Sequence, residues 1–123
     1  MNNPVDWFEL PVLDLERAKG FYERVFGFEM KTHQSNAEYE MVWFPSNKNG
    51  TGITGALVKG IGYNPSLEGT IVYIITDKID KIISNIQSEG GKIHVPKKDI
   101  GEYGMIAIFE DSEGNRVGLH QMK

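Results

Sequence analysis

The fold is decided by the stretch Asp14-Leu-Glu-Arg-Ala-Lys-Gly-Phe-Tyr-Glu-Arg-Val-Phe-Gly27, which returns in weaker form as Asp77-Lys-Ile-Asp-Lys-Ile-Ile-Ser-Asn-Ile-Gln-Ser-Glu-Gly90. Both stretches place a Gly thirteen positions after an Asp (27 − 14 and 90 − 77). Asp is a favoured residue at the start of a helix, and Gly just past its end. We therefore predict a duplicated module. A two-module fold usually puts its binding site where the modules meet.

Apolar residues predict the same order of elements in both halves. Each helix carries a stripe at helical spacing, formed by Leu15, Ala18, Tyr22, Val25 and Phe26 in the first and by Ile79, Ile82, Ile83 and Ile86 in the second. Strands are predicted at 5–12, 28–33, 38–44 and 53–58, and again at 71–76, 92–96, 104–109 and 116–121. The result is an α+β fold with the order βαβββ twice. Module 1 spans about residues 5–58 and module 2 about 70–122, with a Gly- and Pro-rich linker at about 59–69.

The composition favours one soluble domain with neither a nucleic-acid nor a membrane partner. The chain has 123 residues, a formal charge of −4 and no Cys. This length suffices to bury a core. The negative charge argues against a nucleic-acid surface, and no apolar run approaches the length of a membrane span. The first residues lack the pattern of a signal peptide, so we expect a cytoplasmic location.

The order of motifs resembles that of a known family. The Asp14 to Gly27 stretch, a later Gly90-Gly-Lys92 and the closing Phe109-Glu-Asp-Ser-Glu-Gly-Asn-Arg-Val-Gly-Leu119 are similar to the glyoxalase/bleomycin-resistance/dioxygenase (vicinal oxygen chelate) superfamily, in particular its lactoylglutathione-lyase-related group. The resemblance covers about residues 7–120 and departs at Ser112, where the family's turn usually carries Pro. It implies that the two modules form a curved mixed sheet that encloses a cleft.

The resemblance also implies a metal site, and the sequence predicts that this site is lost. Enzymes of the family hold a divalent ion with His, Gln or Glu side chains on the first and last strand of each module. The corresponding positions here are Trp7, Ile71, Thr54 and Gly118. Three of them have no atom that binds a metal, and Thr54 offers only a neutral hydroxyl. We therefore expect no metal and no cofactor.

Glu9 and His120 are the candidate catalytic residues. Each lies two residues beyond a former metal position, so it points to the same strand face. In a common cleft, as the resemblance implies, Glu9 would orient His120 as a general base for proton abstraction beside a carbonyl. Two other interpretations stay open: the pair hydrogen-bonds a ligand without chemistry, or both residues are structural. The candidate ligand-binding residues are Trp7, Thr54, Ala56, Tyr73 and Gly118.

Other polar residues have simpler explanations. His33 and His94 follow the two helices, but no second donor lies at metal-ligand spacing, so we expect no metal there. The acidic residues Glu110, Asp111 and Glu113 lack the spacing of a calcium loop. A charged hairpin turn accounts for these three carboxylates.

Three functional hypotheses remain. The favoured one is a glyoxalase/bleomycin-resistance-like protein that binds a small organic molecule after loss of the metal site, either as a pure binder or as a metal-independent acid/base enzyme. The second is a metal-dependent lyase or dioxygenase with a rearranged site that uses Glu9 and His120. The third is a non-catalytic dimeric binding module. A homodimer is expected under all three, because the family often completes its cleft with modules from two chains. Whether the chain is an enzyme is not decided by its sequence.

Overall fold

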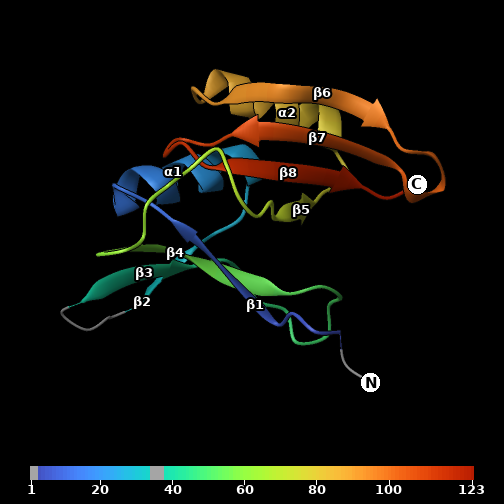
Figure 1. Cartoon of the computed structure of the whole chain (residues 1–123). Helices are drawn as coiled ribbons and strands as arrows, with labels where there is room; N and C mark the ends of the chain where they lie inside the picture. Colours follow the sequence, from blue (N-terminus) through green and yellow to red (C-terminus); the bar gives the residue numbers. More distant parts are fainter. Residues whose placement is uncertain (1–2, 34–37) are drawn as a thin grey trace.

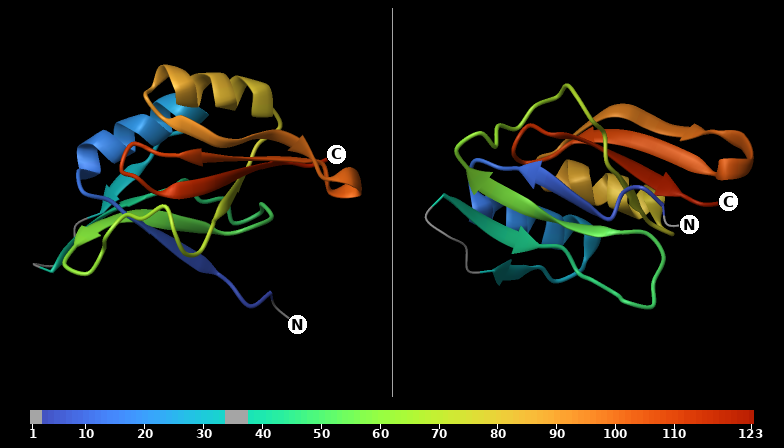
Figure 2. Two further views of the ribbon diagram at one scale, coloured as in Figure 1. Left: turned by 45° about the horizontal axis from the view of Figure 1, so that its top comes forward. Right: turned by 60° about the horizontal axis from the view of Figure 1, so that its bottom comes forward.

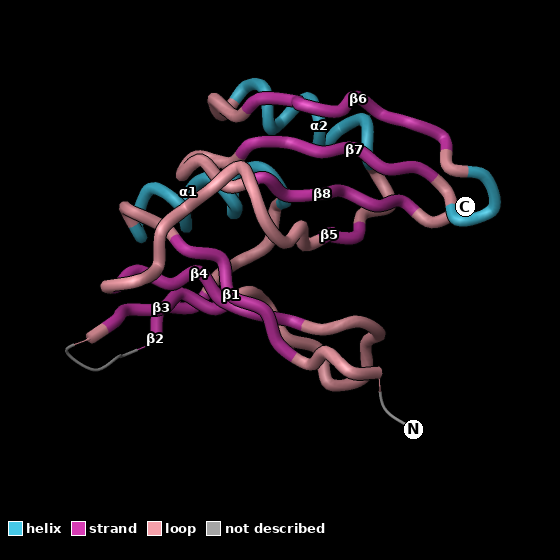
Figure 3. Tube along the Cα trace, in the orientation of Figure 1, coloured by secondary structure: helices cyan, strands magenta, loops and turns pink. Residues whose placement is uncertain are grey.

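A computed structural model of the chain describes residues 3–33 and 38–123. Figure 1 shows the elements in chain order and Figure 3 separates helices from strands. Module 1 contains β1 (Trp7–Pro11), α1 (Leu15–Phe26), β2 (Lys31–His33), β3 (Tyr39–Trp43) and β4 (Thr54–Gly60). Module 2 contains β5 (Tyr73–Ile75), α2 (Ile79–Ser88), β6 (Lys92–Asp99), the short 3-10 helix η1 (Gly101–Tyr103), β7 (Met105–Glu110) and β8 (Arg116–Gln121). The predicted order βαβββ is confirmed in both halves.

Each module forms its own four-stranded mixed sheet. The strand orders are β1-β4-β3-β2 and β5-β8-β7-β6. In each sheet the first strand of the module runs parallel to the last, and the remaining neighbours are antiparallel. The predicted α+β class is therefore confirmed, although the two sheets do not close into one. The first strands β1 and β5 remain as sheet edges.

The ends of α1 follow the sequence signals. The Asp14 side chain accepts a hydrogen bond from the backbone N–H of Arg17 at 3.0 Å, which satisfies one of the free donors at the helix start. Gly27 ends the helix in the left-handed conformation with φ of 79°. Both predictions for this helix are confirmed. Its ends could be predicted because the signals are local and need no partner from elsewhere in the fold.

The start of α2 differs from the prediction that Asp77 caps it. The helix begins one residue later, with Lys78 at the cap position and no capping hydrogen bond from its own side chain. Instead, the Gln121 side chain on β8 accepts a hydrogen bond from the N–H of Ile79 at 2.8 Å. The cap is supplied by a residue 42 positions away, so a local sequence pattern does not reveal it.

β6 is longer than predicted because it lies at a sheet edge. It continues to Asp99 through Pro96, with shifts of register between Ile93 and Val95 and between Val95 and Lys98. Pro has no N–H to donate to a neighbouring strand, and edge strands and bulges tolerate this loss. The strand therefore passes through a residue that would end a central strand.

One buried core joins the two modules. α1 contacts β3, β4 and α2, while α2 contacts β6 and β8, and two further views show the helices lying together beside the sheets (Figure 2). Phe21 of α1 is 1% exposed, and its ring lies 6.4 Å from that of Phe109 on β7. The Asn85 side chain of α2 donates to the carbonyl of Val25 in α1 at 2.9 Å. The helices thus fix how the modules sit against each other.

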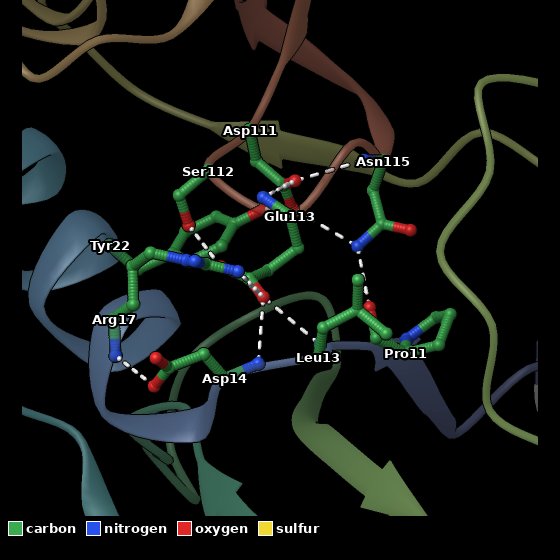
Figure 4. Close-up of polar contacts among 9 residues, drawn as sticks. All are labelled: Pro11, Leu13, Asp14, Arg17, Tyr22, Asp111, Ser112, Glu113 and Asn115. Atoms are coloured by element: carbon green, nitrogen blue, oxygen red, sulfur yellow. Dashed lines mark hydrogen bonds and ion pairs between the residues drawn. The ribbon is translucent and has the colours of Figure 1, made fainter.

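A buried carboxylate from module 2 holds the start of α1 in module 1 (Figure 4). Glu113, in the turn between β7 and β8, accepts hydrogen bonds from the N–H groups of Leu13 and Asp14, both at 2.9 Å. It also pairs with Arg17, whose Nε lies 2.7 Å from Oε2 and whose Nη2 lies 2.9 Å from Oε1. Ser112 donates to Oε2 at 2.9 Å, a contact that the Pro usual in the family could not make. We call these contacts the Glu113 clamp.

Asp111 and Asn115 complete the connection from the same turn (Figure 4). The buried Tyr22 hydroxyl donates to Asp111 at 2.7 Å, and the N–H groups of Glu113 and Asn115 donate to the same carboxylate. The Asn115 amide donates to the carbonyl of Pro11 at 2.7 Å. Burial raises the pKa of Asp111, and these hydrogen bonds oppose that rise. The expected charged hairpin turn joins β7 and β8, but its residues Asp111 and Glu113 are buried, at 4% and 7% exposed.

The Glu113 clamp predicts a stability loss that depends on pH. Burial tends to raise the pKa of Glu113, but hydrogen bonds from Arg17, Asp14 and Ser112 bring it below its usual 4.5. Glu113→Gln should lower the free energy of unfolding by about 2–3 kcal/mol at pH 7, because it breaks a charge pair of which only the acid is fully buried. Urea unfolding, followed by circular dichroism, measures this loss.

The pH dependence has a defined sign. A depressed folded-state pKa stabilises the fold above about pH 4.5, and this contribution is lost as the pH falls through the folded-state value. The difference between wild type and Glu113→Gln should therefore shrink below about pH 4. The control Glu16→Gln changes an exposed acid in the first turn of α1. Equal effects of the two variants at pH 7 would contradict the clamp.

Candidate functional site

A cavity lies between the edge strands β1 and β5 of the two sheets. It has a volume of about 1040 Å³ and is lined by all of β1 and by residues 71–75, which include all of β5. These are the first strands of the two modules, so the cavity opens at the place where the duplicated architecture predicts a site. Loop residues 51–53 and several residues of the segment 64–70 complete its border.

One wall of the cavity is aromatic and aliphatic. Phe8, Phe28 and Phe44 line it from module 1, with the rings of Phe8 and Phe28 5.4 and 5.9 Å from that of Phe44. Val72 and Ile74 line it from module 2. Phe44 is 7% exposed, whereas the other four are only partly buried. Apolar side chains that border open space in this way offer a surface to an apolar ligand.

Glu9 provides a carboxylate on the rim of the cavity. Its Oε2 accepts a hydrogen bond from the indole N–H of Trp7 at 3.3 Å, and its Oε1 one from the Tyr63 hydroxyl at 3.4 Å. The negative charge of Glu9 raises the pKa of Tyr63, with burial adding to the rise. The Trp7 ring also packs edge-on against Trp43, with 5.0 Å between centroids. The Glu9 carboxylate is thus held between two aromatic side chains.

Besides Glu9, a set of polar residues lies where the linker meets β8. Asn115 and Arg116 line the cavity there, together with Ser66. The N–H of Ser66 donates to the Asn115 side chain and the N–H of Arg116 donates to the carbonyl of Ser66, both at 3.3 Å. Asn115 is 4% exposed. The lining of the cavity therefore carries charges of both signs, the carboxylates of Glu9 and Glu68 and the guanidinium of Arg116.

His120 does not line the cavity that Glu9 lines. His120 lies on β8, where its Nε2 is 2.6 Å from the backbone carbonyl oxygen of Tyr103, and it is not among the lining residues of the cavity. A carbonyl only accepts, so Nε2 carries the proton and Nδ1 is left for other partners. Within this chain the two candidate catalytic residues do not share a cavity, and their joint role stays a prediction.

The candidate ligand-binding residues divide into two groups. Trp7, Thr54 and Tyr73 line the cavity with Glu9, whereas Ala56 and Gly118 do not. Ala56 is fully buried beside Glu9 in the register of β1 and β4. Gly118 lies under the Tyr73 ring, which comes within 2.4 Å of the position that a Cβ on Gly118 would occupy.

The strand register corrects one of the four former metal positions. Trp7 pairs with Thr54 across β1 and β4, and the equivalent pair across β5 and β8 is Tyr73 and Gly118. Tyr73 is therefore the counterpart of Trp7, whereas the sequence comparison gave Ile71, which precedes β5. The shift arises because Trp7 lies eight residues before the start of α1, whereas Tyr73 lies six residues before the start of α2.

The residues at these positions do not fit a divalent ion. The Thr54 hydroxyl donates to the carbonyl of Pro45 at 2.7 Å, and Gly118 is covered by the Tyr73 ring. Trp7 offers an N–H donor, which cannot bind a metal. Over residues 3–33 and 38–123, no group of three or more His, Asp or Glu side chains could hold a metal ion. His33 instead stacks on Trp43 at 3.8 Å, and His94 pairs with Glu110 at 2.8 Å.

Two functional candidates were missed from the sequence alone. Arg116 lies two residues before Gly118 on β8, so the alternation of a strand would have placed it on the same face as Gly118 and His120. Tyr63 lies in the linker, where nothing in the local pattern indicates that it reaches Glu9. A spacing of two residues from Gly118, one of the family's metal positions, would therefore have indicated Arg116. No pattern in the sequence would have indicated Tyr63.

Solved structures share this architecture. A glyoxalase/bleomycin resistance/dioxygenase domain from Frankia superimposes with a TM-score of 0.74 at 14% identity, covering 100% of both chains. TnmS3, an antibiotic-binding protein from a Streptomyces species, gives a TM-score of 0.66 at 26% identity and covers 99% of this chain and 98% of its own. The trypanothione-dependent glyoxalase I of Leishmania major gives 0.69 at 15% identity, covering 98% and 87%.

Sequence comparison points the same way. The putative glyoxylase CFP32 of Mycobacterium tuberculosis is 27% identical over 122 residues, which cover 94% of this chain and 44% of that protein. This chain thus spans less than half the length of the curated relatives it matches. The family model of the Glyoxalase/Bleomycin resistance protein/Dioxygenase superfamily matches residues 5–119. With the duplicated βαβββ fold, this match shows that the chain belongs to the glyoxalase/bleomycin resistance protein/dioxygenase superfamily.

Proposed function

We propose that this protein binds a small, partly aromatic or aliphatic organic molecule in the cavity between β1 and β5 and does so without a metal. The observation that carries the proposal is the cavity itself, which has a wall of Phe and aliphatic side chains and polar residues around it. Its volume of about 1040 Å³ is at the upper end of the range for pockets that take drug-sized molecules.

The residues at the family's metal positions support the absence of metal chemistry. An indole, a hydrogen-bonded hydroxyl, a phenol and a glycine occupy the four positions that the strand register makes equivalent. Three of the four are also cavity residues, so they would contact the ligand directly. The similarity to TnmS3, an antibiotic-binding protein, favours binding over turnover. We therefore assign Glu9 a role in holding a polar group of the ligand.

The binding proposal is tested with the neutral probe 3-phenyl-1-propanol. Trp7 and Trp43 are the only tryptophans in the chain, so ¹⁵N-labelled protein gives two indole N–H signals. Trp7 lines the cavity and Trp43 does not, so the Trp7 signal should move more on titration. Trp7→Phe and Trp43→Phe assign the two signals.

A cavity-filling substitution provides the control for that titration. Val72→Phe adds bulk to the cavity wall and should weaken probe binding by about tenfold, the size expected when apolar contacts are displaced. Leu13→Phe makes a similar change at an exposed position outside the cavity and should leave the affinity unchanged. Equal affinities for both variants would show that the probe binds elsewhere and would refute the site.

The absence of a metal predicts no response to divalent ions. Protein purified without chelator should contain far less than one equivalent of metal. Nickel, zinc, manganese, iron and cobalt should leave the Tm unchanged, since an ion present at 100 times its Kd would add about 2.7 kcal/mol and raise Tm by several degrees. One equivalent of metal that is lost in Glu9→Gln or His120→Ala would instead support the lyase or dioxygenase alternative.

We also propose that the protein works as a homodimer. The face of β5 away from the core exposes Tyr73 by 46% and Ile75 by 60%, and Ile106 and Ile108 on the same sheet are partly exposed. Large apolar side chains that gather on one sheet face are typical of a protein contact. A second copy placed over this face would cover these side chains and narrow the open cavity next to β5.

The homodimer predicts that a charge introduced on the face of β5 separates the two copies, whereas a charge introduced in the linker does not. Ile75→Lys should convert the dimer to a monomer, because it places a charge in the proposed contact. Ile61→Lys changes an apolar residue that is 98% exposed in the linker and should leave the mass unchanged. Light scattering coupled to size-exclusion chromatography measures the molar mass of both variants. A monomeric wild type at high micromolar concentration would overturn this part of the proposal.

A further inference from the structure

Arg116 is a cation that lines the cavity and has one donor without a partner. Its Nε is buried and has no hydrogen-bond partner in the described part of the chain. Its side chain forms no ion pair with any described residue, whereas Arg17, Arg24 and Lys97 each pair with a carboxylate. A buried donor without a partner costs free energy, so native structures rarely leave one unless something else satisfies it.

The acids nearest to Arg116 do not fill this role. Glu110 is its register partner on β7, but the Glu110 carboxylate is bound by His94 at 2.8 Å. Glu68 lines the same cavity and forms no ion pair with Arg116. Glu113 lies three residues away and is engaged by Arg17 in the Glu113 clamp. The guanidinium therefore keeps its charge and its donors for a group that enters the cavity.

The backbone around Arg116 holds the residue in place. Its N–H donates to Ser66, and its neighbour Asn115 is fixed by Pro11 and Asp111. β8 pairs on one side with β5, which lines the cavity, and on the other with β7. The backbone that carries the guanidinium is thus fixed beside the cavity, as expected of a preorganised anchor.

We propose that Arg116 is the anchor for a carboxylate, and that the ligand of this cavity is a small organic acid. This inference rests on the proposed function and names the class of molecule bound there. The acid group pairs with the guanidinium, whose fork of N–H donors matches a carboxylate. The aromatic or aliphatic part lies along the wall formed by Phe8, Phe28 and Ile74.

The charge of the cavity argues against more than one negative charge on the ligand. Arg116 is the only Lys or Arg among the lining residues that the structure describes, and Glu9 and Glu68 line the same space. A dianion such as a phosphate monoester would face two carboxylates with only one cation to balance it. A monocarboxylate pairs with Arg116 and leaves Glu9 to accept a hydrogen bond from a hydroxyl or amine elsewhere on the ligand.

Three probes with the same skeleton test the assignment. The full-length chain is titrated by calorimetry with 3-phenylpropionate, 3-phenyl-1-propanol and 3-phenylpropylamine. The acid should bind at least tenfold more tightly than the alcohol, and the amine more weakly than the acid. Added sodium chloride should weaken the binding of the acid and not that of the alcohol, because salt screens a partly exposed charge pair.

Substitutions at Arg116 separate this inference from the proposed function. Arg116→Gln should reduce the affinity for the acid to that for the alcohol and leave the alcohol unchanged, while Arg116→Lys should keep part of the preference. Arg24→Gln removes an exposed cation outside the cavity and should have no effect. If Arg116→Gln does not fold, the comparison of acid and alcohol in the wild type and the reduced acid preference of Arg116→Lys still test the role of Arg116.

The outcomes are distinct. Equal affinities of acid and alcohol in the wild type, or an acid preference that survives in Arg116→Gln, would overturn the role of Arg116 while the binding function stands. Binding of neither acid nor alcohol would overturn the proposed function and this inference together. A preference for the amine would reverse the assignment and make Glu9 the anchor.

Discussion

The structure depends on one buried carboxylate that reaches from one module to the other. Glu113 accepts two backbone hydrogen bonds at the start of α1 and pairs with Arg17 of the same helix. A carboxylate buried without such partners would be costly, so the turn between β7 and β8 and the start of α1 hold each other in position. Because β1 leads directly into that helix start, the position of the cavity's first wall is fixed by a residue of the other module.

The same turn connects the Glu113 clamp to the candidate site. Asp111, Glu113 and Asn115 are all used to join the modules, and Arg116 follows them as the first residue of β8. The Asn115 amide holds the carbonyl of Pro11 at the end of β1, while its side-chain oxygen receives the N–H of Ser66. One short segment thus sets the spacing between β1, the linker and Arg116. Changes in this turn should affect stability and ligand binding together.

Local signals made most of the fold predictable. The Asp14 cap and the Gly27 end depend on neighbours in sequence, and the structure has both. Most residues of the two apolar stripes are buried, but Phe26 and Ile83 are only partly buried, and the buried Phe21 was not predicted. The other misses involve distant partners. Gln121, and not Asp77, caps the start of α2. Glu113 can be buried because its carboxylate pairs with Arg17, which lies 96 residues earlier in the chain. For the site, Trp7, Glu9 and Tyr73 line one cavity, but so do the remaining residues of β1 and β5, so strand alternation alone does not select them. Which side chains lack a partner, as the Nε of Arg116 does, depends on the whole fold.

The residues at the family's metal positions also form part of the cavity wall. A metal site needs small, polar donors that converge on one point, whereas Trp7 and Tyr73 place rings there. Tyr73 can lie against the sheet only because residue 118 is Gly, since any Cβ at that position would meet the ring. The two residues are therefore coupled, and restoring a ligand at 118 would displace Tyr73 from the cavity wall. Metal coordination and aromatic contact thus exclude each other at this position, which favours a ligand held by its shape and its charge.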